Sequence, residues 1–581
     1  MSDIRINSIT VKNFRSFGEG QDFFFPPADY LKPVAIVGYN NSGKTNLMGS
    51  ILYGIGEKFI SEKTFEIVDL HNMDTNNHIE IVSNLSGSAY GFDYRGNPKS
   101  IAGDYTISTQ VEDGEIKSRI SRSFFGANKH YGIFYINFHN IKEEIATQKT
   151  SWGNIRSFLG RHIQKLVDSD TSMQAKKVTF ESEVSASTDK VLDESALSSF
   201  IDIIRKNYST NLRNNDCNVD FGLPNYEDIF LKMMFKIGLN GNTDNLIPID
   251  HFGDGFISMF VMAVIQAIAE SNTEDKCLFL FEEPESFLHE NHQEYFYKTV
   301  LCGLAEKGHQ VIYTTHSEKM IDPFDTKGLI RLEMDENDQT ICKYNEIEDF
   351  SIEEIDDNTG EVINLSRYNE FIKTVEPNLN RILFSKKVIL VEGPNDVLVY
   401  KYAIKKKVLE EISTNEEILN KEKYSEAFLN FENISIVCHH GKATANYLIE
   451  LCKHFEVDYF VINDWDFEAD ELSLEEVSAF NSLDDLKSSH LYIGSDKKAM
   501  ITTNYNLIKN ATIDKIHFNV KKLESVINYN SNDKSSLGIW NVLQGMSSEQ
   551  FNEMLIPSSL LDFIGLTRMV AVDEIAEEIE A

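Results

Sequence analysis

The fold-deciding stretch of this chain is Val34-Ala35-Ile36-Val37-Gly38-Tyr39-Asn40-Asn41-Ser42-Gly43-Lys44-Thr45. Its first four residues favour a short buried strand, and residues 46–53 favour a helix. Between them, Gly38 and Gly43 let the backbone turn its N–H groups toward phosphate oxygens. In this kind of loop the lysine reaches the β and γ phosphates, and the threonine hydroxyl meets Mg²⁺. The sequence therefore predicts a nucleotide site made by Gly38, Asn41, Ser42, Gly43, Lys44, Thr45 and Asn46.

Length and composition indicate an ordinary globular protein of several domains. The chain has 581 residues, of which 42% are hydrophobic and 25% charged, enough for about three domains with cores of their own. The start, Met1-Ser2-Asp3-Ile4-Arg5, lacks an apolar signal segment, and no run approaches the roughly 18 apolar residues of a membrane span. We expect a cytoplasmic protein without a membrane partner. Its six cysteines form no Cys-x-x-Cys pair, which favours reduced thiols over disulfides or a zinc motif.

The charge balance argues against a nucleic-acid partner at first sight. There are 55 basic and 91 acidic side chains, a net charge of −36, whereas nucleic-acid binders usually carry a basic footprint. Three short lysine clusters lie in the C-terminal third, at 405–407, 497–498 and 521–522. Local binding of phosphates stays open, although each cluster taken alone is typical of a solvated helix face.

Two further strands in the first half end in chemically useful side chains. Residues 277–281 are apolar and run into Glu282-Glu283-Pro284-Glu285. Metal-bound ATP needs one carboxylate for the Mg²⁺ shell, assigned to Glu282, and one to orient or deprotonate the attacking water, assigned to Glu283. The strand at 310–315 delivers His316, which is positioned to sense the γ-phosphate. The alternatives are an acidic helix cap and a structural histidine.

This order of motifs resembles the ATPase heads of the ABC class that act on DNA, in the style of the SMC and RecF families. The matching segments are Phe14-Arg15-Ser16-Phe17, the Glu282–Glu285 segment and Thr315-His316-Ser317. The family's Ser-Gly-Gly-type signature is represented only loosely by His251-Phe252-Gly253-Asp254-Gly255, so tight closure of two heads over ATP and fast turnover are not implied. Asn137 is the candidate for the glutamine that usually follows the phosphate loop.

The C-terminal part contains a second group of acidic residues. A buried-type strand at 388–391 ends at Glu392, and after the Gly393-Pro394 turn Asp396 opens a helix. A later strand, 459–463, brings in Asp464 and Asp466, which lie on the same side if the chain stays extended. These four carboxylates would repel one another without cations, so the pattern predicts one or two Mg²⁺ or Mn²⁺ ions. Two ions about 4 Å apart would stabilise both oxygens of a phosphodiester displacement. Structural salt bridging is the alternative.

The strand-Glu-Gly and strand-Asp-x-Asp order resembles a Toprim domain, and its fusion to such a head resembles the OLD (overcoming lysogenisation defect) nucleases, including the nuclease subunit of Gabija and retron effectors. The fold implied is α/β: an ABC/SMC-like P-loop ATPase head with a helical insertion, followed by a C-terminal Toprim α/β domain. We expect head lobes at 1–140 and 241–375, the insertion at 141–240 and the Toprim domain at 376–581. The polar insertion shows no sustained heptad, so it is either a compact dimerisation element or a loop-rich elaboration.

The resemblance also implies site residues. Metal ligands would be Glu392, Asp396, Asp464, Asp466 and Glu524, the last within Lys522-Leu523-Glu524, where the family has Asp in place of Lys522. A lysine near the scissile phosphate is assigned to Lys534, with Lys498 as a rival. The catalytic set is then Glu392, Asp464, Asp466 and Lys534, with Glu283 in the head.

The function implied is an ATP-regulated, metal-dependent endodeoxyribonuclease of anti-phage defence that uses ATP with Mg²⁺ or Mn²⁺ and hydrolyses ATP slowly. Its partners would be DNA, further copies in a homodimer or larger oligomer, and a companion such as a helicase-like subunit or a reverse transcriptase with its nucleic acid. The main alternative is a non-cleaving, ATP-gated DNA clamp or sensor. A topoisomerase or primase would need further domains or a zinc ribbon, and a transporter ATPase would need a strong signature motif. Neither the direction of ATP control nor the DNA specificity follows from these residues.

Overall fold

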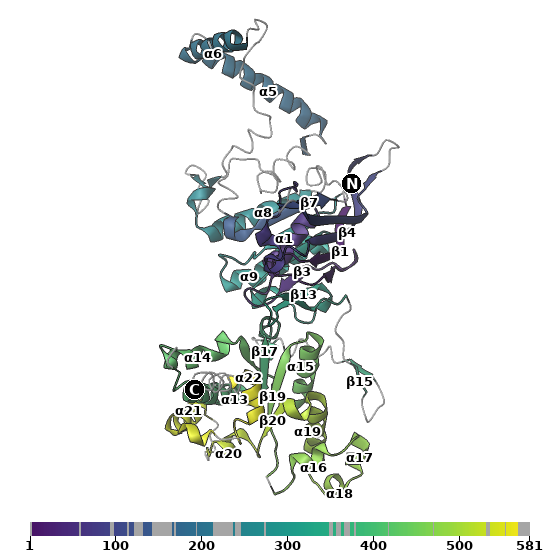
Figure 1. The fold of residues 1–581 in the computed structure, drawn as a ribbon, viewed down its shortest axis with the longest axis vertical. Coiled ribbons are helices and arrows are strands. Elements are labelled where there is room, and N and C mark those ends of the chain that lie inside the picture. The colour runs from purple at the N-terminus through teal and green to yellow at the C-terminus, as the bar shows by residue number, and fades with distance from the viewer. Residues whose placement is uncertain are drawn as a thin grey trace.

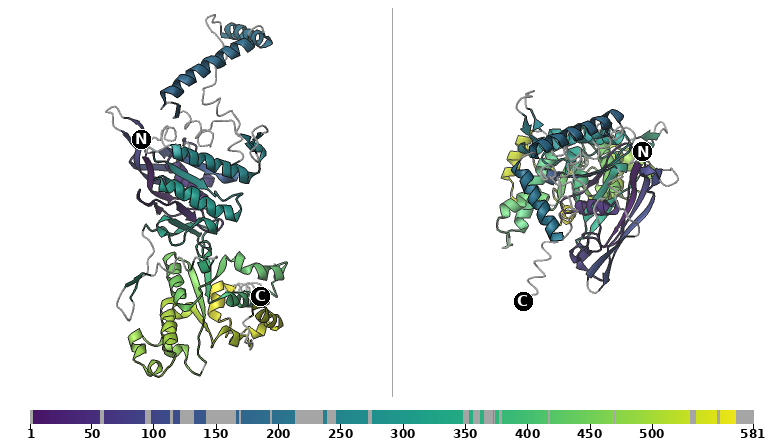
Figure 2. Two further views of the ribbon diagram at one scale, coloured as in Figure 1. Left: turned by 180° about the vertical axis from the view of Figure 1, so that it is seen from behind. Right: turned by 90° about the horizontal axis from the view of Figure 1, so that it is seen from above.

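The computed structural model consists of two sheet-based units stacked along the long axis of the molecule, with a helical pair beyond the first (Figures 1 and 2). It describes residues 3–56, 60–92, 98–112, 115–120, 132–141, 166–167, 170–192, 195–212, 236–238, 246–271, 275–347, 353–355, 362–364, 372, 374–376, 379–415, 418–468, 470–529, 535–551 and 554–566. Among these residues, no helix combines the length and the apolar character that a bilayer crossing would need.

The first sheet of the N-terminal unit is antiparallel. Its strands follow the order β2-β1-β4-β6-β7, and β5 pairs with β4. Side chains 4, 6, 9 and 11 of β1 are all buried because a register shift between Ile6 and Ser8 inserts one residue and resets the alternation. The strands are β1 (Asp3–Lys12), β2 (Gln21–Phe24), β4 (Glu80–Phe92), β5 (Pro98–Ser100), β6 (Gly103–Glu112) and β7 (Glu115–Ile120).

The second sheet carries the strands predicted from the phosphate loop and the acidic motif. Its order is β14-β13-β3-β12-β11-β8, and all neighbours are parallel except β14. The carboxyl ends of the five parallel strands therefore meet at one edge, where ligands bind in open α/β sheets. The strands are β3 (Val34–Val37), β8 (Ile133–Asn137), β11 (Leu278–Glu282), β12 (Gln310–Thr314), β13 (Leu329–Met334) and β14 (Thr340–Tyr344).

Helices cover both faces of this second sheet. Helix α1 (Lys44–Gly54) shares a buried core with both sheets, and α8 (Asp254–Ser271) packs on the opposite face together with α9 (Glu290–Phe296) and α10 (Cys302–Glu306). A π-helical turn at Tyr297–Leu301 joins α9 to α10. Short 3-10 turns lie at Ile67–Asp69, His71–Met73, Phe138–Asn140, Ile249–His251, Glu318–Met320 and Thr326–Gly328.

The predicted insertion is described in part. Helices α5 (Thr171–Leu192) and α6 (Ala196–Leu212) pack on each other and stand at the end of the molecule that is far from the C-terminal unit (Figures 1 and 2). Two short strands, β9 (Lys236–Ile237) and β10 (Ile247–Pro248), pair after them. The boundaries 141–240 stay a prediction, since long stretches of this region lie outside the described residues.

The C-terminal unit is built on a four-stranded parallel sheet of order β18-β17-β19-β20. Alternate side chains of β17 face opposite cores: Val388 and Leu390 pack on the side of α15 and α19, whereas Ile389 and Val391 pack on the side of α13, α14, α21 and α22. The strands are β17 (Lys387–Val391), β18 (Ile434–Cys438), β19 (Asp458–Asp464) and β20 (Ile516–Asn519).

The covering helices are α13 (Pro394–Glu411), α14 (Lys421–Phe431), α15 (Lys442–His454), α19 (Lys498–Ala511), α21 (Ser536–Gly545) and α22 (Ser558–Ile564). Shorter elements are α12 (Arg381–Phe384), α16 (Leu474–Ser478), α17 (Leu483–Lys487), α18 (His490–Ile493), α20 (Leu523–Val526), two 3-10 turns at Ile513–Lys515 and Ser548–Gln550, and the hairpin of β15 (Glu353–Ile355) with β16 (Val362–Asn364).

A buried arginine joins the two units. Arg331, on β13, is 1% exposed and pairs with Glu333 on the same strand. Its guanidinium also donates to the backbone oxygens of Phe455 at 3.1 Å and Ser385 at 3.0 Å, both in the C-terminal unit. Nearby, His454 and Tyr344 hydrogen-bond at 3.0 Å, and one apolar core runs across the junction. The units are thus packed together by a shared apolar core and by the hydrogen bonds of a buried arginine.

Candidate functional site

The phosphate loop has the backbone that its glycines predict. Gly43 has φ 95°, in the left-handed region, and a Cβ there would lie 2.0 Å from Oγ1 of Thr340. Gly38 has φ 151°, and its Cβ would fall 2.3 Å from the backbone oxygen of Leu332. Only glycine fits either position, and α1 begins directly at Lys44.

A cavity of about 670 Å³ opens over this loop, a size typical of small-molecule sites. Its lining is mostly polar and combines the loop with residues from four other segments: Ser16, Asn40, Asn41, Ser42, Gly43, Lys44, Thr45, Asn46, Glu283, His316 and Met334. The structure therefore brings most of the predicted nucleotide residues together. Gly38 and Glu282 are not among the described residues that line it.

Lys44 is folded back onto its own loop. Its ammonium donates to the backbone oxygens of Gly38 and Tyr39, both at 2.9 Å. Burial lowers the pKa of Lys44 to about 8, although the carboxylates of Glu283 and Glu285 act in the opposite direction. An anionic phosphate would accept stronger hydrogen bonds from this ammonium than the neutral carbonyl oxygens do, so it can replace them as the partner of Lys44.

Two histidines clamp Glu283. Its carboxylate contacts Nε2 of His316 at 3.2 Å and Nε2 of His139 at 2.6 Å, and its backbone is left-handed with φ 46°. The hydrogen bond from His316, assisted by the charge of both histidines, holds the pKa of Glu283 at about 2. So weak a base suits orienting a water molecule better than deprotonating it at neutral pH.

The neighbouring acids have separate partners. Glu282 accepts from the hydroxyl of Tyr135 at 2.7 Å and from Nδ2 of Asn137 at 3.0 Å, and Asn137 is its register partner on β8. Glu285 is buried and accepts from the backbone N–H of His316 at 2.6 Å, which fixes the turn that carries this histidine. The two glutamates therefore position their surroundings while Glu283 faces the cavity.

In the Phe14–Phe17 motif, the serine is the residue that reaches the cavity over the phosphate loop. Phe14 and Phe17 are fully buried anchors, and between them Ser16 lines the cavity. Its hydroxyl accepts from Nδ2 of Asn46 at 2.7 Å and from Oγ1 of Thr340 at 2.6 Å. Sequence reasoning used the motif as a family marker but gave no role to Ser16. It also missed His139, although His139 follows Asn137 at the same sheet edge.

In the C-terminal unit, Glu392, Asp396, Asp464 and Glu524 gather at the carboxyl edge of the parallel sheet. Burial raises the pKa of Asp396 to about 7 and that of Asp464 to about 7, and the charge of Glu392 adds to both shifts. Among the described residues, Oε2 of Glu392 is buried without a hydrogen-bond partner. A buried, unpartnered oxygen beside carboxylates that ionise with difficulty fits a divalent cation held by oxygen ligands.

Neutral groups hold these acids in place. Asp464 accepts from the backbone N–H of Leu523 at 2.9 Å and from Nδ2 of Asn519 at 3.4 Å. The buried hydroxyl of Tyr400 donates to Oδ1 of Asn519 at 2.8 Å, which fixes the amide orientation. Asp396, the third residue of α13, accepts from the backbone N–H of the N-cap residue Gly393 at 3.0 Å.

Asp466 differs from its prediction. Strand β19 ends at Asp464, and Asp466 has φ 67°, so the chain does not stay extended through it. Short polar residues tolerate this left-handed backbone. The carboxylate of Asp466 forms an ion pair with Lys442, whose ammonium also donates to Oδ1 of Asn504 at 2.8 Å. The expectation of an extended Asp-x-Asp segment is therefore wrong, and metal ligation by Asp466 stays a prediction.

The lysines are placed unevenly. Lys534 lies outside the described residues, which resume at Ser535. The rival Lys498 lies over the ring of Tyr492, at 5.8 Å. Lys442 begins α15, directly after the turn that follows β18, and so lies at the same sheet edge as Glu392. Sequence reasoning passed over Lys442 because its partner Asp466 comes from another strand.

Two family models match this chain. Residues 98–321 match a model described as an AAA ATPase domain, and residues 383–466 match one described as an overcoming lysogenization defect protein-like TOPRIM domain. This pair of domains makes the chain similar to the OLD nucleases. The TOPRIM match includes Glu392, Asp396, Asp464 and Asp466. The two domains together suggest use of a nucleotide and of divalent metal.

Three relatives are similar over most of their length. An OLD nuclease of Thermus scotoductus (strain ATCC 700910 / SA-01) is 25% identical over 81% of this chain and 84% of its own. Endonuclease GajA of Bacillus cereus (strain VD045) is 23% identical over 71% and 69%, and the Old nuclease of Escherichia phage P2 is 25% identical over 70% of each chain. A solved Smc head domain from Pyrococcus furiosus aligns with 64% of this chain and 99% of its own at 14% identity, but its TM-score of 0.35 supports no conclusion.

Proposed function

We propose that this protein is an OLD-type, ATP-binding endonuclease that hydrolyses phosphodiester bonds in DNA with divalent cations. The observation that carries the proposal is the acidic cluster at the end of four parallel strands, in which Glu392 keeps a buried, unpartnered oxygen. Burial, assisted by the charge of Glu392, raises the pKa values of Asp396 and Asp464 there. The printed names of the three relatives, all nucleases, support the same reaction.

In this proposal Glu392, Asp396, Asp464 and Glu524 hold Mg²⁺ or Mn²⁺, with Asp466 as a further ligand after it leaves Lys442. The bound ions supply an activated water and stabilise the attacking and leaving oxygens. Tyr400 and Asn519 keep Asp464 aimed at the site through their hydrogen bonds. The protein's own contribution is a set of oxygen ligands of which Asp396 and Glu524 are buried and Glu392 and Asp464 half-buried.

For the basic group beside the scissile phosphate, Lys442 has more support than Lys534. Lys442 lies at the first residue of α15, where the helix dipole also favours an anion, and its partner Asp466 belongs to the acidic motif. A phosphate that replaced Asp466 as the partner of Lys442 would free this carboxylate for metal. Lys534 stays a prediction.

The head would bind ATP in the cavity over the phosphate loop, with Thr45 serving its Mg²⁺. Glu282 stays a prediction for the same ion, because its carboxylate accepts from Tyr135 and Asn137. Slow hydrolysis is expected because Glu283 is a weak base held by two histidines. Nucleotide state would then regulate cleavage through the junction at Arg331, whose register partner Val37 directly precedes the phosphate loop.

We assign the four segments as head lobes 1–140 and 241–375, insertion 141–240 and Toprim domain 376–581. The biological role that fits is cytoplasmic anti-phage defence as a homodimer or larger oligomer, beside a helicase-like or reverse-transcriptase companion. The similarity to endonuclease GajA supports this role.

The test is cleavage of supercoiled and linear plasmid in Mg²⁺ or Mn²⁺, with and without ATP. Asp464→Asn should lower cleavage by about 100-fold or more, because it removes a metal-ligating charge. The matched control Asp458→Asn changes an exposed acid on the same strand, 3.9 Å from Lys515, and should cleave normally.

Two lysine variants extend the test. Lys44→Ala should alter only the response of cleavage to ATP. Lys442→Ala should lower cleavage, whereas its control Lys453→Ala, on the same helix, should not.

DNA binding without cleavage by the wild-type protein in either metal, in the presence of its neighbour-encoded companions, would favour the ATP-gated clamp instead. Equal cleavage by wild type and Asp464→Asn would remove the acidic cluster from the mechanism.

A further inference from the structure

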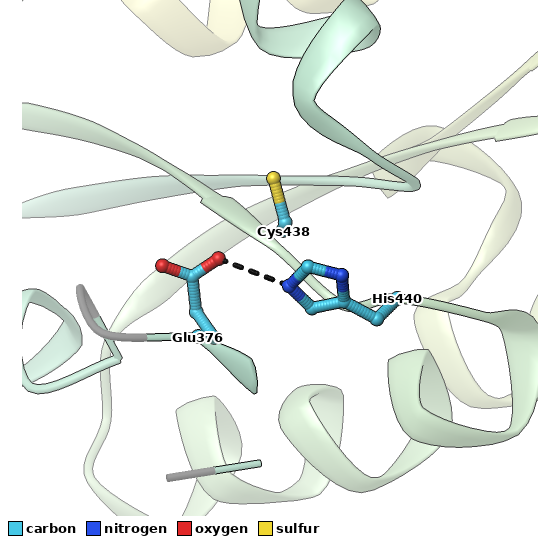
Figure 3. A group of neighbouring side chains, drawn as sticks. All are labelled: Glu376, Cys438 and His440. Carbon is cyan, nitrogen blue, oxygen red and sulfur yellow. Dashed lines mark hydrogen bonds and ion pairs between the residues drawn. The ribbon is translucent and has the colours of Figure 1, made fainter. Parts of the chain in front are cut away.

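A second group of metal-ligating side chains lies beside the acidic cluster and has no part in the proposed reaction. Glu376 comes from the connection that precedes β17, Cys438 is the last residue of β18, and His440 lies in the turn before α15 (Figure 3). One ligand atom from each lies within 4.8 Å of the other two. Among the described residues, it is the group of three or more His, Cys, Asp or Glu side chains whose ligand atoms lie this close to one another.

The spacing agrees with a tetrahedral zinc ion. Nε2 of His440 and Oε2 of Glu376 are 3.3 Å apart. Two ligands at about 2.0–2.1 Å from a tetrahedral Zn²⁺ are separated by about 3.3–3.4 Å. A Zn–S bond of about 2.3 Å puts the sulfur about 3.6 Å from the other two atoms, so each distance from the Cys438 sulfur has to shorten by about 1.2 Å at most.

The donor set selects the class of ion. Thiolate and imidazole are ligands that Zn²⁺ prefers, whereas Mg²⁺ and Ca²⁺ prefer oxygen alone. Glu376 and Cys438 are buried, while His440 is exposed, so an ion can enter from solvent and keep water as its fourth ligand. The competing explanation is a hydrogen-bonded trio, in which the thiol of Cys438 and the ring of His440 both contact the Glu376 carboxylate.

We propose that Glu376, Cys438 and His440 bind one Zn²⁺ ion, with the Cys438 proton released to solvent as the Zn–S bond forms. The site would tie the segment entering the C-terminal unit to the end of β18. Its position matters for the acidic cluster, because the backbone N–H of His440 donates to the backbone oxygen of Glu392 at 3.2 Å. The ion would thus hold the turn against which the cluster is built.

The first measurement is metal content of the full chain after dialysis against buffer with Mg²⁺ and a slight excess of Zn²⁺, followed by gel filtration. We expect one zinc per chain in wild type and background in Cys438→Ser and His440→Ala. The control Cys452→Ser removes another buried thiol, on α15, and should retain the zinc. Asp464→Asn should also retain it, which separates this site from the acidic cluster.

The second measurement is the absorption spectrum after replacement by Co²⁺. A thiolate-to-cobalt charge-transfer band should appear in wild type and in Asp464→Asn and be absent in Cys438→Ser. Substitution of the buried Cys438 can impair folding, so the exposed His440 provides an independent test. His440→Ala should lose zinc while its circular dichroism spectrum stays the same as that of wild type. Background zinc in wild type, or zinc that survives in Cys438→Ser or is lost only in Asp464→Asn, would overturn the proposal.

Discussion

At the scale of single residues, the hydroxyl of Tyr400 should matter for metal binding although it does not touch the metal ligands. It donates to Asn519, which donates to Asp464. Tyr400→Phe keeps the ring but frees the amide to rotate, so the Mn²⁺ concentration for half-maximal cleavage should rise about 10-fold. Titration of cleavage against Mn²⁺ measures this shift. Tyr402→Phe, on the same helix, is the control, and an unchanged Mn²⁺ dependence in Tyr400→Phe would contradict the positioning role.

A buried histidine makes stability sensitive to acid. Burial, assisted by the charges of Lys276 and Lys307, lowers the pKa of His309 to about 4, and its Nδ1 accepts from the backbone N–H of Cys277 at 3.0 Å. The ordinary pKa of about 6.5 applies when unfolded, so the stabilisation is complete above pH 6.5 and is lost as pH falls from 6.5 toward 4. The loss is at most about 3 kcal/mol.

The check is the apparent melting temperature at pH 7.5 and pH 5 for wild type and His309→Asn. The asparagine oxygen can accept the same N–H bond but cannot take up a proton, so the fall between the two pH values should be several degrees smaller in the variant. Equal falls would show that His309 does not titrate in this range.

At the scale of elements, the phosphate loop offers a matched pair of glycines. Gly43→Ala would place a Cβ 2.0 Å from Thr340 in a left-handed backbone, so the loop must shift, and ATP affinity should fall by about 10-fold or more. At Gly49, inside α1, a Cβ would meet nothing within 4 Å, so Gly49→Ala should bind ATP normally. Binding of a fluorescent ATP analogue measures both. Normal affinity in Gly43→Ala would contradict the rigid loop.

Sequence reasoning was strongest where a strand runs directly into a functional residue. The strands before Gly38, Glu282, His316 and Glu392 were all predicted. The first three lie in one parallel sheet, so their carboxyl ends had to meet at one edge, whereas the strand before Glu392 belongs to the sheet of the C-terminal unit. The strand before Asp464 was predicted as well, but the left-handed turn at Asp466 was not, since it depends on pairing with the residues after β20.

Sequence reasoning failed where side chains meet across distant segments. Lys442 begins helix α15 and Asp466 follows strand β19, and Glu376 reaches Cys438 from outside the sheet. No local spacing records such contacts. For the same reason, the absence of a Cys-x-x-Cys pair in the sequence says nothing about the group formed by Glu376, Cys438 and His440.

At the scale of the whole molecule, the junction arginine should carry the nucleotide signal. Arg331→Lys keeps the charge but cannot donate to Phe455, Ser385 and Glu333 together, because lysine lacks the planar fork. Cleavage without nucleotide should be retained within about threefold, whereas the effect of ATP should fall by about 10-fold. Plasmid cleavage with and without ATP measures both. Arg381→Lys, at an exposed ion pair with Glu318, is the control, and an undiminished ATP effect in Arg331→Lys would exclude this route.

The pairing of β3 with β13 gives the protein a short mechanical linkage. Val37, the residue before the phosphate loop, is the register partner of Arg331, so nucleotide contact and domain contact are one strand spacing apart, about 5 Å. Because hydrogen bonds join the two strands, we expect the pair to move as a rigid body instead of unfolding locally. Rigid-body domain motions take microseconds to milliseconds. The conformation of the C-terminal unit would therefore follow the present nucleotide occupancy of the head, with no slow phase that depends on earlier occupancy.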